Sequence, residues 1–195
     1  MKRKVSLPMI LGAALILCSL CVLLVFQLRV SAGDRNCRRM ADALAARLPQ
    51  RTAGVPGVSL TADMPVLELD GTDWVALVEL PAYGAALPVA DRWDSGGLAA
   101  SPARFTGSCY ENTLVIGGVD SPRQFGFCDT VGHGDLVTVT DMTGVQFSYT
   151  VVDIDRAKHA DAAWLTGADC DLTLFCRDVH TVEYIAVRCN YRANG

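Results

Sequence analysis

The chain has 195 residues, of which 51% are hydrophobic and 19% are charged, and its formal net charge is −4. This length is typical of one domain with an appendage, and the apolar fraction excludes a disordered protein. The first 30 residues hold four of the 17 basic residues and no acidic ones, which leaves 13 basic against 21 acidic residues, a balance of −8, in the remainder. Because such a surface repels phosphate backbones, we do not expect nucleic acid as a partner.

The N-terminal end combines a basic start with a long apolar run. Lys2, Arg3 and Lys4 precede residues 5–26, which contain no charge. Crossing a bilayer takes about 20 apolar residues, whereas a cleaved signal peptide has a shorter apolar core. We therefore predict one transmembrane anchor over residues 1–30, with a signal peptide as the alternative. Basic residues stay in the cytoplasm, which predicts a single-pass cell-membrane protein whose C-terminal domain is extracytoplasmic.

A helix is expected directly after the anchor. Asp34 is a suitable N-cap, and the apolar residues Met40, Leu44 and Leu48 recur at four-residue spacing before a proline. A stretch rich in Gly and Pro follows. We interpret residues 31–66 as a stalk helix and a linker.

The rest of the chain, residues 67–195, has the pattern of a β domain. Short runs rich in Val, Thr, Leu and aromatic residues alternate with Gly, Asp and Pro. These predicted strands are Trp74–Leu80, Thr113–Ile116, Leu136–Thr140, Gln146–Ile154, Leu172–Phe175 and Val182–Val187. Asp141–Gly144 is typical of a hairpin turn, and Asp155–Leu165 is the one helical segment expected in this region. The spacing of the strands indicates a mainly β fold, either a closed barrel or a sandwich.

The cysteine pattern gives no metal site. Six cysteines lie outside the anchor: Cys37, Cys109, Cys128, Cys170, Cys176 and Cys189. They form no C-x-x-C pair and there is no histidine cluster, so we expect neither a zinc site nor another cofactor. Both disulfides and buried thiols remain open for these residues.

Three groups of segments resemble the sortases, and most closely classes B and D. Sortases are membrane-anchored cysteine transpeptidases that join surface proteins to thick bacterial cell walls. The segments are Trp74–Pro81 with Leu87–Val89, Asn112–Gly118 with Phe125–Gly126 and Gly134–Asp135, and Asp171–Phe175 with Tyr184–Cys189. Their order and spacing cover residues 73–191. The resemblance implies a sortase-like closed β-barrel of about eight strands with short helices, preceded by one transmembrane helix.

The resemblance also implies which positions should carry the chemistry. In sortases a cysteine attacks a sorting-signal peptide, a histidine transfers protons and an arginine donates hydrogen bonds. Here the histidine position falls on Val119 and the next position on Asp120, while the cysteine falls on Arg177 and the arginine on Tyr184. We therefore expect a catalytically degenerate protein that acts as a peptide-binding or structural surface module. The expected partner is a sorting-signal-like peptide, or a cell-wall or pilus protein, in a groove lined by these four residues.

An active enzyme is the alternative. Cys176 lies one residue before the expected nucleophile, His180 could serve as the base and Arg188 as a replacement arginine. A bulge would be needed to turn Cys176 outward, because in a regular strand it shares a face with Leu172 and Leu174, which favours a core thiol. Arg188 could equally be a surface residue in an ion pair.

A disulfide is a separate prediction. If Arg177 and Tyr184 face one another across an antiparallel pair, then Cys170 and Cys189 lie close to each other across the same pair. A disulfide between them would link the last two strands.

Overall fold

The structure is a computed structural model that describes residues 15–22, 24, 37–57, 63–93, 101–122 and 124–193. It divides into two compact units, Met1–Asn36 and Cys37–Gly195. In the first unit, residues 15–22 and 24 are helical. Among the residues described, no helix is both long and apolar enough to cross a membrane. Most of the predicted anchor, and the predicted N-cap Asp34, lie outside the described residues.

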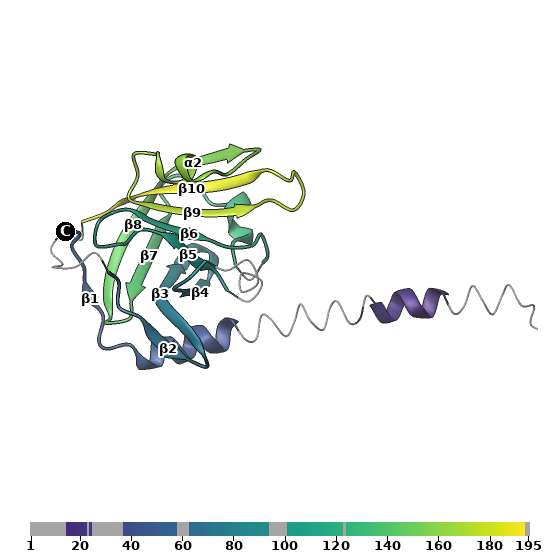
Figure 1. The fold of residues 1–195 in the computed structure, drawn as a ribbon, viewed down its shortest axis with the longest axis horizontal. Helices are drawn as coiled ribbons and strands as arrows, with labels where there is room; N and C mark the ends of the chain where they lie inside the picture. The colour runs from purple at the N-terminus through teal and green to yellow at the C-terminus, as the bar shows by residue number, and fades with distance from the viewer. Residues whose placement is uncertain are drawn as a thin grey trace, which may run out of the picture. The chain divides into compact units, whose positions relative to one another are not determined.

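The second unit contains a closed barrel of eight strands (Figure 1). Each strand of the barrel is hydrogen-bonded to the next around the ring β3–β4–β5–β6–β9–β10–β8–β7–β3. The strands are β3 (Thr72–Leu80), β4 (Ala85–Ala90), β5 (Ala103–Thr106), β6 (Leu114–Gly117), β7 (Leu136–Asp141), β8 (Val145–Ala157), β9 (Leu172–Arg177) and β10 (Tyr184–Tyr191). The predicted mainly β, closed-barrel fold is therefore confirmed. Short helices, η1 (Pro81–Tyr83), η2 (Gly126–Asp129) and α2 (Ala162–Thr166), join the strands.

The side chains of β9 alternate between two buried faces of the strand. In β9, Leu172, Leu174 and Cys176 belong to the cluster that fills the barrel. Thr173 and Phe175 point the other way, and Phe175 belongs to a second cluster with Leu165 of α2. A strand that is buried on both faces reads as a continuous apolar run, which is the pattern of residues 172–176.

The helix after the first unit packs against the barrel domain. Residues 37–47 are helical, and the side chain of Leu44 is completely buried. Leu44 forms a cluster with Leu69, Trp74 and Met142, so the helix covers the hairpin of β2 (Leu67–Leu69) and β3. Residues 31–66 were predicted to be a stalk helix and a linker, and the four-residue spacing of apolar side chains in this helix serves a contact with the barrel domain.

The local predictions were mostly accurate in the second unit. The hairpin turn is present, because Gly144 has a φ of 87° and its N–H donates to the Asp141 carbonyl at 3.1 Å. The predicted helix Asp155–Leu165 was wrong over its first half, since β8 continues to Ala157 and α2 begins only at Ala162. A further short strand, β1 (Thr52–Ala53), pairs with β8 outside the ring.

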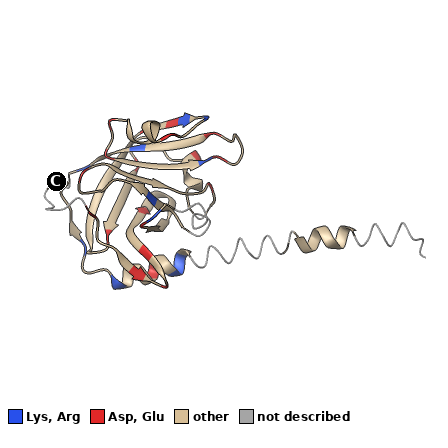
Figure 2. Ribbon diagram, in the orientation of Figure 1, with Lys and Arg blue, Asp and Glu red and all other residues tan. Residues whose placement is uncertain are grey.

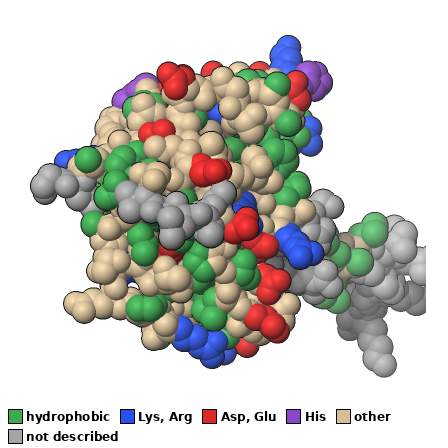
Figure 3. All heavy atoms as spheres, turned by 60° about the vertical axis from the view of Figure 1, so that its left-hand side comes forward, with side chains coloured by type: hydrophobic (Ala, Val, Ile, Leu, Met, Phe, Trp, Pro, Cys, Tyr) green, Lys and Arg blue, Asp and Glu red, His purple; other side chains and the backbone are tan. Residues whose placement is uncertain are grey.

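Charged residues are spread over the outside of the barrel. Figure 2 shows acidic residues along the β2–β3 hairpin, where Glu68, Asp70 and Asp73 lie in the sequence. Figure 3 shows acidic side chains at several separate places on one face. This distribution agrees with the acidic balance of the sequence.

Candidate functional site

The ends of β6, β9 and β10 bring together the residues that the sequence singled out. β6 and β9 are parallel with Gly117 opposite Phe175, so Val119 follows on beside Arg177. β9 and β10 are antiparallel with Arg177 directly opposite Tyr184. The register therefore places Arg177 and Tyr184 side by side on β9 and β10, while Val119 lies two residues beyond the end of β6.

Arg177 and Tyr184 form an exposed pair on the outside of the barrel. The guanidinium carbon of Arg177 lies 5.9 Å from the centre of the Tyr184 ring, a cation–π contact. The Arg177 Nε also donates to the Val182 carbonyl at 3.4 Å. Arg177 is exposed and Tyr184 is half-buried. A cation and a hydroxyl are therefore available to an acceptor group on a bound ligand.

Cys176 faces the opposite way from Arg177. Its side chain is 1% exposed and lies in the barrel core. Its thiol is 4.0 Å from the Phe125 carbonyl. The Cys176 thiol and burial raise the pKa of the Cys128 thiol in η2. The β9–β10 register is regular through Cys176 and Arg177, so no bulge in this ladder turns Cys176 toward solvent.

His180 lies in the loop after β9 with its ring exposed. Its backbone N–H donates to Asp178 at 2.7 Å. Within the part of the chain that the structure describes, no hydrogen bond joins the His180 ring to a thiol. The arrangement of Cys176 and His180 is therefore not that of a nucleophile and its base.

A network of three carboxylates and one arginine lies beside these residues. Asp120, Asp129 and Asp178 have carboxylate oxygens within 4.8 Å of one another. Arg156 of β8 donates to Asp129 at 3.0 Å and to Asp178 at 3.3 Å. Asp120 accepts from the backbone N–H of Val179 at 3.0 Å. The spacing would suit a cation, but Arg156 already supplies positive charge to two of the three carboxylates.

Sequence reasoning identified Asp120 in this network and missed the other three residues. Arg156 was assigned to a helix, whereas it lies in β8. Asp178 carries a recognisable local signal, because an Asp followed by a Thr three residues later is typical of a turn in which the side chain binds the backbone. The carboxylate of Asp178 accepts from the backbone N–H groups of His180 and Thr181 and from the Thr181 hydroxyl.

The charge of Asp178 should make the stability of this loop depend on pH. The Thr181 hydroxyl and the His180 N–H hold the pKa of the Asp178 carboxyl well below its usual range. A carboxyl with a lowered folded-state pKa stabilises the protein above its unfolded pKa, about 4, and this stability is lost as the pH falls through the folded value. We expect Asp178→Asn to lower stability at neutral pH and to flatten the loss below about pH 4. Urea unfolding from neutral pH through the acid range measures both the stability at neutral pH and its loss in acid.

Asp153→Asn provides the matched control, because Asp153 is an exposed carboxylate of β8. Its stability should follow the wild-type pH profile. An Asp178→Asn variant with the same acid dependence as the wild type would show that the lowered pKa of Asp178 does not stabilise the fold.

The outer face of β6 and β9 is covered by aromatic side chains. The Trp93 ring lies 5.2 Å from the Phe175 ring, and Phe105 makes edge contacts with both. Trp93 lies so close over β6 that a Cβ at Gly117 would be 2.0 Å from its ring. The middle of this face is therefore closed, which leaves the strand ends around Arg177 as its accessible part.

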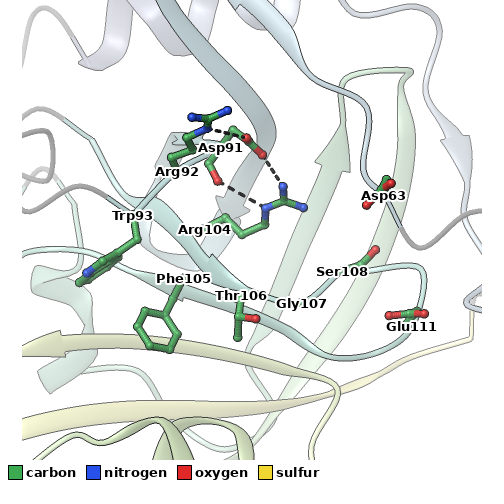
Figure 4. A pocket seen from close by; sticks show the side chains of 10 residues that line it. All are labelled: Asp63, Asp91, Arg92, Trp93, Arg104, Phe105, Thr106, Gly107, Ser108 and Glu111. Atoms are coloured by element: carbon green, nitrogen blue, oxygen red, sulfur yellow. Dashed lines mark hydrogen bonds and ion pairs between the residues drawn. The ribbon is translucent and has the colours of Figure 1, made fainter.

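A separate pocket lies beside this aromatic cluster (Figure 4). Its volume is about 550 Å³. Figure 4 shows Trp93 and Phe105 at one end, Glu111 and Asp63 at the other, and Arg104 between them. Arg104 donates to the Asp91 carboxylate, so this central charge is already paired. The four predicted groove residues do not line this pocket.

Arg188 does take part in an ion pair, since its Nη2 lies 3.6 Å from the exposed Asp155 carboxylate, but it is a buried residue and not the surface residue that was expected. Its side chain is 2% exposed and lies beneath α2. It donates to the carbonyls of Leu165 at 2.9 Å and Trp164 at 2.6 Å, and to the Thr173 hydroxyl at 3.1 Å. Because helices end with unpaired carbonyls, Arg188 serves as the cap of α2. The Arg188 Nε is buried without a hydrogen-bond partner among the described residues, and the 2% exposure of the side chain keeps it from a substrate at the surface.

Cys170 and Cys189 are free thiols in the structure, and the disulfide between them stays a prediction. The strand register behind the prediction is present, since Arg177 faces Tyr184. However, Cys170 lies before the first residue of β9, and its sulfur contacts the Thr173 hydroxyl at 3.4 Å. The side chain thus follows its own strand instead of reaching across to Cys189.

Comparison with known proteins identifies the fold. No protein-family model matches the chain, and no curated protein matches it in sequence. Among solved structures, sortase A from Corynebacterium diphtheriae matches with a TM-score of 0.55 and 18% identity, over 87% of this chain and 94% of that one. Sortase C1 from Streptococcus agalactiae has a TM-score of 0.55 and 22% identity, over 66% and 72%. A sortase D5 transpeptidase from Clostridium perfringens has a TM-score of 0.51 and 18% identity, over 62% and 80%.

The similarity thus extends to sortases of three classes, A, C and D, and at these identities it concerns the fold. The ring of eight strands and the short connecting helices are the features that carry it. The protein has a mainly β, sortase-like closed-barrel fold.

Proposed function

We propose that this protein is a membrane-anchored, extracytoplasmic sortase-like protein that binds a peptide without cleaving it. The observation that carries the proposal is the direction of two neighbouring side chains at the end of β9. Arg177, at the position expected for the nucleophile, is exposed, whereas Cys176 is 1% exposed in the barrel core. A thiol that faces the core cannot attack a bound peptide, and a guanidinium is not a nucleophile.

The surroundings of Arg177 support peptide binding. Val179 and Val182 are 65% and 53% exposed in the loop beside it, which offers apolar contact area. Arg177 offers a cation suited to a carboxylate or a peptide carbonyl. A peptide of the sorting-signal type, or a segment of a wall or pilus protein, has both kinds of group. The basic start and apolar run of residues 1–26 support the proposed anchor and orientation.

Peptide turnover distinguishes the proposal from an active enzyme that uses Cys176. The full chain, purified in detergent, is incubated with L-P-x-T-G-like peptides and an amine acceptor, and products are followed by mass spectrometry. We expect no cleavage and no transfer by the wild type. Turnover that is lost in Cys176→Ala would contradict the proposal and establish the enzyme.

Peptide binding is measured on the same chain by calorimetric titration. Arg177→Ala and Tyr184→Ala should each weaken binding about tenfold, which corresponds to the loss of roughly 1.4 kcal/mol. Lys158→Ala is the control, because Lys158 is an exposed cation just after β8. Binding that is unaffected by both site variants would place the peptide elsewhere, and no binding by any such peptide would favour a purely structural role.

A further inference from the structure

The pocket beside the aromatic cluster contains a tryptophan ring that is both exposed and fixed in position. The pocket volume of about 550 Å³ lies within the range of about 300–1,000 Å³ that is usual for small-molecule sites. Trp93 is 37% exposed, and its ring packs against Phe175 at 5.2 Å and edge-on against Phe105 at 5.6 Å. It also lies against the backbone at Gly117, since a Cβ there would overlap the ring. A ligand therefore meets an aromatic surface that does not have to be ordered on binding.

The centre of the pocket is a charge pair that offers both donors and acceptors. Arg104 donates through Nη2 to the Asp91 carboxylate and through Nε to the Asp91 carbonyl at 3.4 Å, and both side chains are partly buried. The third guanidinium nitrogen, Nη1, has no hydrogen bond to a described residue and points away from Asp91 in Figure 4. The second carboxylate oxygen of Asp91 lies 3.9 Å from the exposed Arg92. A ligand can thus accept from Arg104 and donate to Asp91 without breaking the pair.

A carboxylate on a well-ordered turn lines the far end of the pocket. Glu111 is exposed, and none of the ion pairs between described residues includes it. The turn is held by the Ser108 carbonyl, which accepts from the N–H groups of Glu111 at 3.3 Å and Thr113 at 3.1 Å. The Ser108 hydroxyl also lines the pocket, and its oxygen accepts from the Tyr110 N–H at 3.1 Å. The far end therefore offers an acceptor whose backbone is already fixed.

The mixed charges of the lining residues favour a neutral, polar ligand. Three carboxylates and two guanidiniums line the pocket: Asp63, Asp91, Glu111, Arg92 and Arg104. An anion would approach the carboxylates and a cation the guanidiniums, so either would lose hydration without a strong opposite charge in return. An apolar molecule would remove water from these polar groups without replacing its hydrogen bonds. A hydroxyl group both donates and accepts, so a molecule with many hydroxyls suits both kinds of partner.

We propose that this pocket binds a neutral saccharide, with a sugar ring packed on Trp93. The C–H groups on one face of a sugar ring carry a small positive charge, which suits the negative face of an indole ring. The hydroxyl groups of the saccharide bind the Arg104–Asp91 pair and Glu111, where charged partners make the stronger kind of hydrogen bond. The four predicted groove residues do not line this pocket. Saccharide binding and peptide binding can therefore fail independently of each other.

Calorimetric titration of the full chain with matched disaccharides tests the proposal. The chain is kept in a polyoxyethylene detergent, because the sugar headgroup of a maltoside would compete. The probes are two neutral disaccharides, cellobiose and N,N′-diacetylchitobiose, with the anionic cellobiouronic acid and the cationic chitobiose as their charged counterparts. We expect saturable binding of at least one neutral probe with a Kd on the order of 1 mM, and binding of its charged counterpart that is several-fold weaker. Titrations that extend to ten times this concentration without saturable binding of either neutral probe overturn the proposal.

Variants of the lining residues locate the site. Trp93→Ala should weaken binding at least tenfold, and Glu111→Ala about fivefold through the loss of one hydrogen bond. Glu68→Ala is the matched control, because Glu68 is an exposed carboxylate of β2, and Arg177→Ala should also bind the saccharide as the wild type does. Since Glu111 is exposed, its variant decides the question even if Trp93→Ala does not fold. Unchanged binding in Glu111→Ala, or a charged probe that binds as tightly as its neutral counterpart, contradicts the proposal.

Discussion

Replacing Arg188 with methionine is expected to lower the free energy of unfolding by about 3 kcal/mol. The guanidinium is 2% exposed and donates to the Trp164 and Leu165 carbonyls and to the Thr173 hydroxyl. It also lies 5.1 Å from the centre of the Trp164 ring. Methionine is also a long side chain but has no donors, so the Trp164 carbonyl loses the Arg188 hydrogen bond and the Leu165 carbonyl retains only the Thr173 hydroxyl at 3.5 Å. Urea unfolding followed by far-ultraviolet circular dichroism measures the loss.

Two controls separate the hydrogen bonds of Arg188 from its bulk and its charge. Arg188→Lys retains a cation and some of the hydrogen-bond donors, so its free energy of unfolding should fall by less than that of Arg188→Met. Arg92→Ala removes a cation that is 86% exposed and should change stability by less than about 0.5 kcal/mol. Equal stability of Arg188→Met and the wild type would mean that the cost of burying the guanidinium offsets its hydrogen bonds, as happens for some buried ion pairs.

Leu44→Ala is expected to destabilise the barrel domain by about 2–5 kcal/mol. Leu44 is completely buried between the helix at residues 37–47 and the cluster of Leu69, Trp74 and Met142. Removing its side chain leaves a cavity in this contact, which connects the helix to the β2–β3 hairpin. A stalk helix that made no contact with the barrel would give almost no effect. Thermal unfolding monitored by tryptophan fluorescence reports on the change, because Trp74 lies in the same cluster.

Arg47→Ala is the matched control on the exposed side of this helix. It should leave the unfolding midpoint within about 0.5 kcal/mol of the wild type. Unchanged stability in Leu44→Ala would show that the helix folds and packs independently of the barrel.

The strands with strong β-branched and apolar alternation were predictable, whereas two strands of the barrel ring, β4 and β5, were not, nor were the short strands β1 and β2 outside it. β4 contains Pro88, and β5 has only four residues with Arg104 among them. Proline is tolerated in a strand where one edge is unpaired, and β4 pairs with β5 only through Ala90 and Ala103. Arg104 is neutralised by Asp91 from another segment. Both strands are thus stabilised by neighbours that the local sequence does not contain.

The candidate site likewise contains residues that the sequence predicted and residues that only the tertiary structure brings together. The positions of Val119, Asp120, Arg177 and Tyr184 followed from the resemblance and from strand pairing, and the face of Cys176 followed from simple alternation along a strand. Arg156, Asp129 and Asp178 meet only because β8 runs past η2 and the end of β9. The Cys176 thiol likewise lies 4.0 Å from the carbonyl of Phe125, at the start of η2. Such contacts depend on distances between elements and not on any local pattern.

The sequence by itself determined the charge balance, the apolar N-terminal run, the mainly β character of the second unit and the residue types at the expected catalytic positions. These properties depend on composition and on side-chain periodicity, which can be read from short stretches of the chain. Only the tertiary structure decided that the ring of strands closes, that the helix at residues 37–47 belongs to the barrel, and that Arg188 is buried. Each of these results depends on which surfaces of distant segments exclude water together, and the free energy of that burial is a property of the whole fold.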